Sequence, residues 1–320
     1  MSHARTSTAP TGTAPAGATP DDAVPAGTTP TGTAPVDTAP ADVPADVPAD
    51  AGTLARPVTL RGVARTFATP TGPRPVLAGV DLQIAAGEVV AVIGPSGCGK
   101  STLLRQVAGL DAPDAGEILL GGSPVTPYDA RTAVAFQEPR LLPWRTLAHN
   151  VALGVPRGTS RAESREQVAR LLDLVGLSGS AGLRPRQVSG GMAQRASLAR
   201  ALARRPGVLL LDEPFGALDA LTRLRMQDLL LEVHAEQPTT VLLVTHDVEE
   251  ALYLADRVVL LGGLDAERPG ASIRSVITVP GDRPRDRADA RLAELRAELL
   301  DGLGVPTHHH RHDADAHHSI

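Results

Sequence analysis

Short apolar runs alternate with longer segments of helical periodicity between residues 54 and 264. The apolar runs predict β-strands at Val58–Phe67, Glu88–Ile93, Val208–Leu211, Val241–Val244 and Val258–Leu261. The segments between them predict helices at Lys100–Val107, Arg161–Val175, Gly191–Arg204, Ala220–Ala235 and Val248–Ala255. Short strands that alternate with helices indicate a mainly parallel sheet with both faces covered. Residues 54–264 are therefore expected to form one α/β domain.

The segments on either side of this domain differ from it in composition. Residues 1–53 have a proline at every fifth position from Pro10 to Pro40 and bury too little apolar surface to offset chain entropy, so we expect disorder. Residues 265–303 contain a weaker strand, Ile273–Val279, and a short helix, Ala288–Leu300. Residues 304–320 include six of the ten histidines. We interpret this segment as a disordered polar tail and assign no metal site to it.

Composition and charge exclude several classes of protein. The single cysteine excludes a disulfide framework and a cysteine-based zinc site. No run approaches the roughly 18 apolar residues of a membrane span, so we expect a cytosolic protein that reaches a membrane only through a partner. Residues 1–53 carry the whole net charge of −5, because the remaining chain has 30 basic and 30 acidic residues. Without a basic excess, nucleic acid is not expected as a partner.

The octapeptide from Gly94 to Ser101 fits the phosphate-loop pattern G-x-x-x-x-G-K-[ST] between a predicted strand and a predicted helix. Its glycines allow backbone N–H groups to turn toward phosphate oxygens, and the helix N-terminus adds a positive dipole. Lys100 is expected to pair with the β- and γ-phosphates, and the Ser101 hydroxyl to bind Mg²⁺. The candidate ATP-binding residues are Gly94, Pro95, Ser96, Gly97, Cys98, Gly99, Lys100, Ser101 and Thr102.

Two carboxylates end the apolar run at 208–211. Asp212, at the carboxyl end of the predicted strand, is a candidate to hold Mg²⁺. Glu213 follows it and is a candidate base that polarises the attacking water. Acidic residues also end strands for no catalytic reason, so this pair gains its meaning from the motifs around it.

The order of the motifs resembles that of the ATP-binding cassette (ABC) ATPases across residues 54–264. Ser189-Gly190-Gly191 begins a helix 89 residues after Lys100, and His246 comes 34 residues after Asp212. Gln137 lies between the phosphate loop and the Ser-Gly-Gly motif. The resemblance implies an α/β P-loop fold with a RecA-like parallel-sheet core, an antiparallel β-subdomain and an α-helical subdomain that carries the signature. The signature departs from its commonest form at Val188 and Met192, but its serine and glycines are intact.

The resemblance also implies roles for single residues. Phe67 looks like the aromatic residue that stacks on adenine, with a buried edge-strand residue as the alternative. Gln137 resembles the glutamine that senses Mg²⁺ and links the site to a membrane subunit, and His246 resembles the histidine that contacts the γ-phosphate. Ser189, Gly190 and Gly191 resemble the signature that closes on ATP held by a second copy, and Asp219 the aspartate that crosses that interface. A redox role for Cys98 is not expected.

The segment Phe136–Trp144, with the only tryptophan of the chain, carries the prediction of cargo. Its Leu-Leu-Pro-Trp stretch resembles the nitrate, sulfonate and taurine importers, and Asn150–Gly154 and Gly216–Arg223 resemble the aliphatic sulfonate branch most. The resemblance implies a peripheral protein on the cytoplasmic face of the cell membrane, with two permease subunits, a second copy and, indirectly, a solute-binding protein. Taurine or nitrate import remains open, as does a non-transport regulatory ATPase. Trp144 could also be a simple packing residue.

Overall fold

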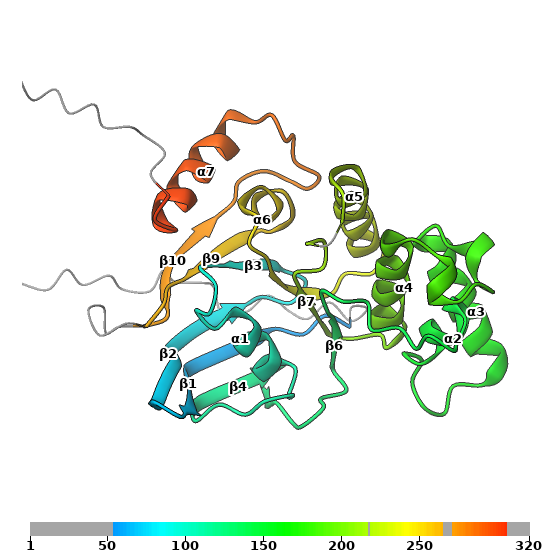
Figure 1. Ribbon diagram of the computed structural model, residues 1–320, viewed down its shortest axis with the longest axis horizontal. Coiled ribbons are helices and arrows are strands. Elements are labelled where there is room, and N and C mark those ends of the chain that lie inside the picture. The colour runs from blue at the N-terminus through cyan, green and yellow to red at the C-terminus, as the bar shows by residue number, and fades with distance from the viewer. Residues whose placement is uncertain (1–53, 217, 265–270, 306–320) are drawn as a thin grey trace, which may run out of the picture. The chain divides into compact units, whose positions relative to one another are not determined.

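The computed structural model describes residues 54–216, 218–264 and 271–305, which contain two sheets (Figure 1). The larger sheet has six strands in the order β10-β9-β3-β8-β7-β6. They are β3 (Val89–Ile93), β6 (Thr132–Ala135), β7 (Val208–Asp212), β8 (Thr240–Val244), β9 (Arg257–Leu261) and β10 (Ile273–Thr278). Strands β9, β3, β8, β7 and β6 run parallel, whereas β10 pairs antiparallel with β9. This arrangement confirms the predicted parallel-sheet core.

The smaller sheet is antiparallel, with the strand order β2-β1-β4-β5. It comprises β1 (Val58–Thr69), β2 (Gly72–Ile84), β4 (Ala115–Leu120) and β5 (Ser123–Pro124). Strands β1 and β2 form a hairpin in which Phe67 faces Arg74 across the ladder. Strand β2 was not predicted, because Pro73 and Pro75 at its start hide its apolar alternation.

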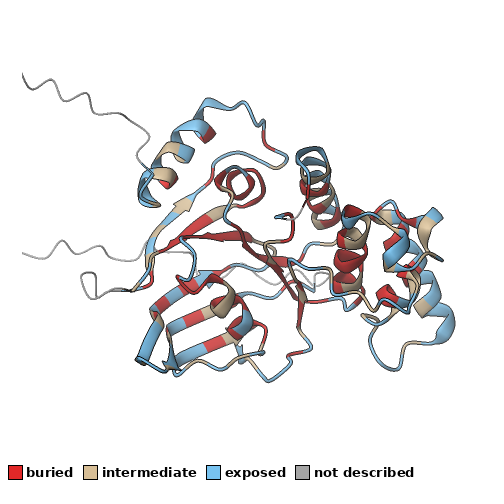
Figure 2. Ribbon diagram, viewed as in Figure 1, coloured by how far each residue is buried: buried red, intermediate tan, exposed pale blue. Residues whose placement is uncertain are grey.

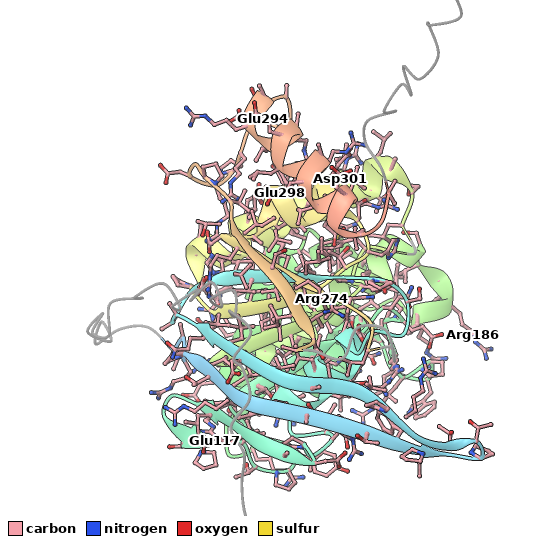
Figure 3. The ribbon with its side chains drawn as sticks, turned by 90° about the vertical axis from the view of Figure 1, so that its left-hand side faces the viewer. Glu117, Arg186, Arg274, Glu294, Glu298 and Asp301 are labelled. Atoms are coloured by element: carbon pink, nitrogen blue, oxygen red, sulfur yellow. The ribbon has the colours of Figure 1, made fainter. Side chains whose placement is uncertain are left out.

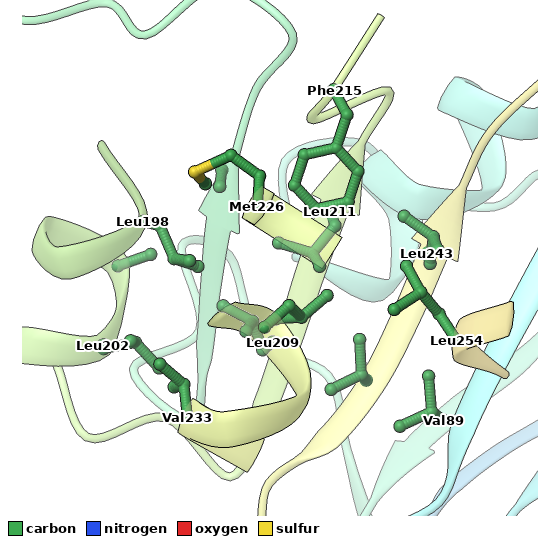
Figure 4. Packing of buried hydrophobic residues seen from close by; sticks show 14 of the residues in the cluster. Val89, Leu198, Leu202, Leu209, Leu211, Phe215, Met226, Val233, Leu243 and Leu254 are labelled. Atoms are coloured by element: carbon green, nitrogen blue, oxygen red, sulfur yellow. The ribbon is translucent and has the colours of Figure 1, made fainter. Parts of the chain in front are cut away.

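Side-chain alternation along the central strands divides the core in two. In β3, Val90 and Val92 point toward the smaller sheet and helix α1 (Lys100–Val107), where they join a cluster with Leu103 and Leu104. Val89 and the other alternate residues point to the opposite face, which the remaining helices cover. Figure 4 shows Leu209, Leu211 and Leu243 of this face packed with side chains of those helices. The strands are buried on both faces, as parallel strands require (Figure 2).

The other helices are α2 (Leu147–Ala152), α3 (Arg161–Leu174), α4 (Gly190–Ala203), α5 (Ala220–Glu236), α6 (Val248–Leu254) and α7 (Ala290–Gly302). Short 3₁₀ turns lie at Ser178–Ser180 and Pro185–Gln187. The expected capping box begins α3: Ser160 Oγ accepts the Glu163 N–H, and the Glu163 carboxylate accepts the Ser160 N–H. Helices α2, α3 and α4 pack on one another (Figure 1). They form the helical part that contains the Ser-Gly-Gly motif.

The C-terminal elements lie close to their predicted positions. Strand β10 ends one residue before the expected strand, and α7 begins two residues after the expected start. Asp289 sets this start, because its side chain accepts the Arg291 N–H as a helix cap. Helix α7 buries Leu292 and Leu299 against the core, while Glu294, Glu298 and Asp301 are exposed on its outer side (Figure 3).

Some sequence predictions concern residues outside the described ranges. The expected disorder of residues 1–53 and nearly all of the histidine tail, 306–320, lie there, as do residues 265–270 and Ala217. The division of the chain at residues 54, 265 and 304 stays a prediction. Within the described residues, no helix is both long enough and apolar enough to cross a membrane.

Candidate nucleotide site

The phosphate loop connects β3 to α1 at the carboxyl edge of the central sheet. Gly99 has φ +105°, and a β-carbon there would lie 2.6 Å from Leu77 Cδ2 and 2.9 Å from Val76 O, so only glycine fits. Lys100 is the first residue of α1, and its Nζ donates to the carbonyl oxygens of Gly94 (2.9 Å) and Pro95 (3.0 Å). The lysine is therefore folded back over the loop, with its ammonium on two loop carbonyl oxygens.

Ser101 and Asp212 bring together the oxygen atoms expected to hold Mg²⁺. Ser101 Oγ donates to Asp212 Oδ1 over 2.9 Å, although the two residues are 111 positions apart in sequence. The contact follows from the topology, since β3 and β7 both flank β8 and end at the same edge. A hydroxyl and a carboxylate are hard oxygen ligands of the kind that Mg²⁺ prefers together with substrate phosphates. The donor set therefore fits the metal.

Glu213 is held in a special backbone conformation next to His246. Its φ is +46°, and its N–H donates to Val244 O over 2.8 Å, which ties it to the end of β8. Glu213 Oε2 lies 3.3 Å from His246 Nδ1. A carboxylate and an imidazole thus face each other at the edge where β7 and β8 end.

Gly216 marks the point where three predicted site residues converge. A β-carbon on Gly216 would lie 3.4 Å from Gln137 Nε2 and 3.6 Å from His246 Cε1, and the Gly216 N–H donates to Glu213 O. The chain segments after β6, β7 and β8 therefore meet here. The structure brings together Gln137, Glu213 and His246, which the sequence analysis assigned to the nucleotide site.

Phe67 is not buried: 38% of it is exposed, and the Arg65 guanidinium lies 4.8 Å from its ring centroid. Arg65 is fixed by ion pairs to Asp111 and Asp114. Arg74, opposite Phe67 in the hairpin, was missed from the sequence. Its Nη2 lies 3.6 Å from the position of a β-carbon on Gly97, at the tip of the phosphate loop. The sequence carried no signal for it, because the pairing of Arg74 with Phe67 appears only in the folded hairpin.

The signature residues form a second group. Ser189 caps α4 by accepting the Met192 N–H, and a β-carbon on Gly191 would lie 2.7 Å from Thr222 Cγ2. Asp219 caps α5 in the same way through Thr222, whose hydrogen bonds hold the pKa of Asp219 below its ordinary value. Within the described part of the chain, no hydrogen bond joins this group to the phosphate loop. The predicted site residues therefore fall into two groups within one copy.

Two further residues clarify earlier alternatives. Cys98 is buried, and burial raises the pKa of its thiol, which disfavours the reactive thiolate. Trp144 is 67% exposed, so it does not pack in the core. It lines a cavity of about 550 Å³ with Pro143, Arg184, Arg186 and Gln187.

Comparisons with known proteins agree with this geometry. Residues 77–216 match the sequence model of the ABC transporter family. The aliphatic sulfonates import ATP-binding protein SsuB 2 of Burkholderia lata is 55% identical over 234 residues, which cover 72% of this chain and 82% of that protein. The nitrate import ATP-binding protein NrtD of Synechococcus elongatus is 47% identical over 248 residues, 75% of this chain and 89% of that protein.

Solved structures show the same fold. A dimeric bacterial ABC transporter cassette superposes with a TM-score of 0.62 at 30% identity, and the match covers 70% of this chain and all of that one. A dimeric post-hydrolysis state of an ATP-binding cassette with ADP and Pi superposes with a TM-score of 0.60, also at 30% identity, with the same coverage. The predicted P-loop ABC fold is therefore confirmed. The chain belongs to the ATP-binding proteins of the ABC transporter family, which hydrolyse ATP to drive transport.

Proposed function

We propose that this chain energises the import of aliphatic sulfonates across the cytoplasmic membrane. The observation that carries the cargo is the 55% identity to a named sulfonate importer subunit, against 47% for a nitrate importer subunit. The Leu-Leu-Pro-Trp stretch after Gln137 points to the same group of importers. Nitrate is the second candidate because of that relative, and taurine the third by resemblance alone. The importer relatives give no support to a non-transport ATPase.

The proposed nucleotide site uses the first group of residues. Backbone N–H groups of residues 94–102, Pro95 excepted, and the Lys100 ammonium would bind the phosphates, and the partly exposed Phe67 ring would stack on adenine. Ser101, Asp212 and Gln137 would hold Mg²⁺, which offsets phosphate charge when bound. Arg74 adds a second cation at the tip of the loop.

Glu213 and His246 are proposed to act on the attacking water and the γ-phosphate. Glu213 accepts the proton of the water, and its left-handed backbone, fixed by the hydrogen bond to Val244 O, sets the direction of the carboxylate. The imidazole at 3.3 Å has one nitrogen on Glu213, which leaves the other free to donate toward phosphate oxygen.

The second group of residues indicates a composite site. Ser189, Gly190 and Gly191 present the N-terminus of a 14-residue helix, and Asp219 lies at the start of α5 beside them. This dipole end suits a phosphate, but the group makes no hydrogen bond to its own phosphate loop within the described residues. We infer that it binds ATP held by a second copy, as the dimeric cassette of known structure suggests.

Trp144 is proposed to contact one of two transmembrane permease subunits, which would keep the protein peripheral on the cytoplasmic face. A large exposed aromatic beside Arg184 and Arg186 is typical of an interface anchor. A solute-binding protein would deliver the cargo on the other side of the membrane.

A growth test separates the candidate cargos. The gene for this chain is deleted, and the strain is grown on ethanesulfonate, taurine or sulfate as sole sulfur source and on nitrate as sole nitrogen source. The proposal is supported if growth is lost on ethanesulfonate and kept on the other three media, and if the parental chain but not Lys100→Ala restores it. Normal growth on ethanesulfonate with failure on taurine or nitrate contradicts the sulfonate assignment.

A further inference from the structure

Residues 279–289, between β10 and α7, hold the C-terminal end of α6 through two arginines. Arg285 is 8% exposed and donates to four carbonyl oxygens, including Leu252 O (3.3 Å) and Tyr253 O (3.2 Å) of α6. Arg283 donates to Leu254 O over 3.3 Å and pairs with Asp256. Cationic donors at a helix C-terminus satisfy its free carbonyl groups and interact favourably with its dipole. The segment therefore fixes one end of α6.

Arg287 of the same segment begins a series of side-chain hydrogen bonds that leads to the other end of α6. Its guanidinium stacks 3.4 Å from the Tyr253 ring centroid and donates to Asp228 Oδ1 over 3.3 Å. Its Nη1 also donates to Gln227 Oε1 over 2.9 Å. Gln227 lies in α5 and is only 2% exposed. The arginine thus reaches a buried amide from the surface.

The other end of that amide faces a buried carboxylate. Gln227 Nε2 donates to Glu250 Oε2 over 3.3 Å, and Glu250, in α6, is 3% exposed. Glu250 Oε1 has no hydrogen-bond partner in the described part of the chain, so the Gln227 amide is an important donor to this carboxylate. A buried carboxylate that loses such a donor is costly to keep in place.

Glu250 in turn is connected to the residues that flank His246. Its N–H donates to Asp247 Oδ1 over 3.1 Å. The Asp247 N–H donates to Thr245 Oγ1 over 3.0 Å. His246 lies between these two residues, 3.3 Å from Glu213. A shift of Glu250 would therefore be passed through Asp247 to the backbone that presents His246.

The orientation of the Gln227 amide is the critical point. An amide oxygen and an amide nitrogen have the same shape, so their partners decide which way the group points. The Arg287 guanidinium can only donate, and it therefore selects the oxygen and turns the nitrogen toward Glu250. Without this cation, the amide can invert and place its oxygen against Glu250, and whenever Glu250 is ionised the two groups repel each other.

We propose that Arg287 is a positioning residue for ATP hydrolysis, which acts through Gln227 and Glu250 to hold His246 against Glu213. The proposal rests on the hydrolytic roles proposed above for Glu213 and His246. It gives residues 279–289 a function in the chemistry, although no hydrogen bond or ion pair found among the described residues joins them to the phosphate loop.

The test compares full-length Arg287→Ala and Arg287→Lys with the parental chain. We expect Arg287→Ala to lower kcat about tenfold, less than the roughly 100-fold that a 1 Å misplacement of a catalytic group can cost, because Arg287 acts through two intervening side chains. The Kd for ATP should stay within about twofold, because the phosphate-binding residues are untouched. Arg287→Lys keeps a cationic donor and should recover most of the loss. Arg296→Ala is the matched control, because Arg296 pairs with Glu249 of α6 on the exposed side and should leave kcat unchanged.

A double-mutant cycle tests whether Arg287 acts on kcat through Gln227. Gln227→Leu should lower kcat by a similar factor, and Arg287→Ala combined with Gln227→Leu should lose no more than either alone. Additive losses, a parental kcat in Arg287→Ala, or equal losses in the Arg296→Ala control would overturn the proposal. Glu213→Gln and His246→Ala are assayed in parallel: parental turnover in these would contradict the proposed site itself. Because the assay uses ATP alone, neither result depends on the cargo.

Discussion

The His246 Nδ1 atom lies 3.3 Å from Glu213 Oε2, which joins the ends of two neighbouring parallel strands. Val244 O adds a second link, because it accepts the Glu213 N–H over 2.8 Å. The candidate base is thus oriented by β8 as well as by its own strand, β7. A side chain held from two strands keeps its direction, which general-base catalysis requires.

Glu213→Gln should bind ATP and hydrolyse it very slowly. The amide keeps the shape of the side chain but cannot accept a proton from water, and loss of general-base help costs about 10²–10⁴ in rate. Gel filtration with Mg-ATP should then show a stable dimer. Normal turnover together with monomers only would show that Glu213 is not the base.

Two inactive variants should complement each other when mixed. Lys100→Ala removes the phosphate-loop cation, and Ser189→Arg blocks the α4 N-terminus with a large side chain. If the site is composite, a mixed dimer contains one intact site and recovers part of the hydrolysis that each variant lacks. Parental activity in either variant alone, measured as phosphate release, would refute the composite site.

Arg74→Ala should weaken ATP binding while leaving adenosine binding unchanged. The guanidinium beside Gly97 faces the phosphate loop, and a hydrogen bond to a charged group contributes about 1.5–3 kcal/mol when shielded from solvent. Because Arg74 is exposed, we expect a rise in the ATP Kd of about threefold to tenfold. Arg61→Ala is the control, since Arg61 lies on the neighbouring strand but pairs with Glu117. Equal effects of the two variants would assign no specific role to Arg74.

The sequence was sufficient to predict the phosphate loop and the carboxyl-edge residues, because their chemistry is local. Lys100 begins and Asp212 ends an element whose periodicity is plain, whereas the role of His246 was implied by the resemblance to the ABC ATPases. Arg74 and Arg287 were not found, because their partners are 23 and 60 residues away, at Gly97 and Gln227. Strand β2 was missed since two prolines interrupt its pattern. Such contacts depend on packing between elements, which periodicity does not report.

Glu250 should make the stability of the protein fall as pH rises from about 4.5 toward 7. The pKa of Glu250 is raised from 4.5 to about 7, chiefly by burial and also by nearby Asp247, while Thr245, Gln227 and Arg223 oppose the shift. The folded state therefore binds a proton that the unfolded state has released, so this contribution is complete below pH 4.5 and is lost through pH 7. Glu250→Gln should flatten the decline in the free energy of unfolding across this window, by at most about 3 kcal/mol.

Urea unfolding at several pH values measures this effect. Glu249→Gln is the control, because Glu249 is the adjacent, exposed carboxylate of the same helix. An unchanged slope in Glu250→Gln, or the same flattening in both variants, would show that Glu250 is not the group responsible.

Trp144→Ala should uncouple transport from ATP hydrolysis. The ring is 67% exposed beside Arg184 and Arg186, so its removal leaves the core and the nucleotide site intact. If it anchors a permease, truncation of a buried interface aromatic costs about 2–4 kcal/mol of binding. ATP binding by the isolated subunit should be unchanged, whereas sulfonate uptake by the reconstituted complex should fall at least tenfold.

Trp144→Phe keeps an aromatic ring and should retain much of the uptake. Val276→Ala, on exposed strand β10, is the control for loss of surface apolar area. Uptake at the parental rate in Trp144→Ala would exclude this residue from the permease interface.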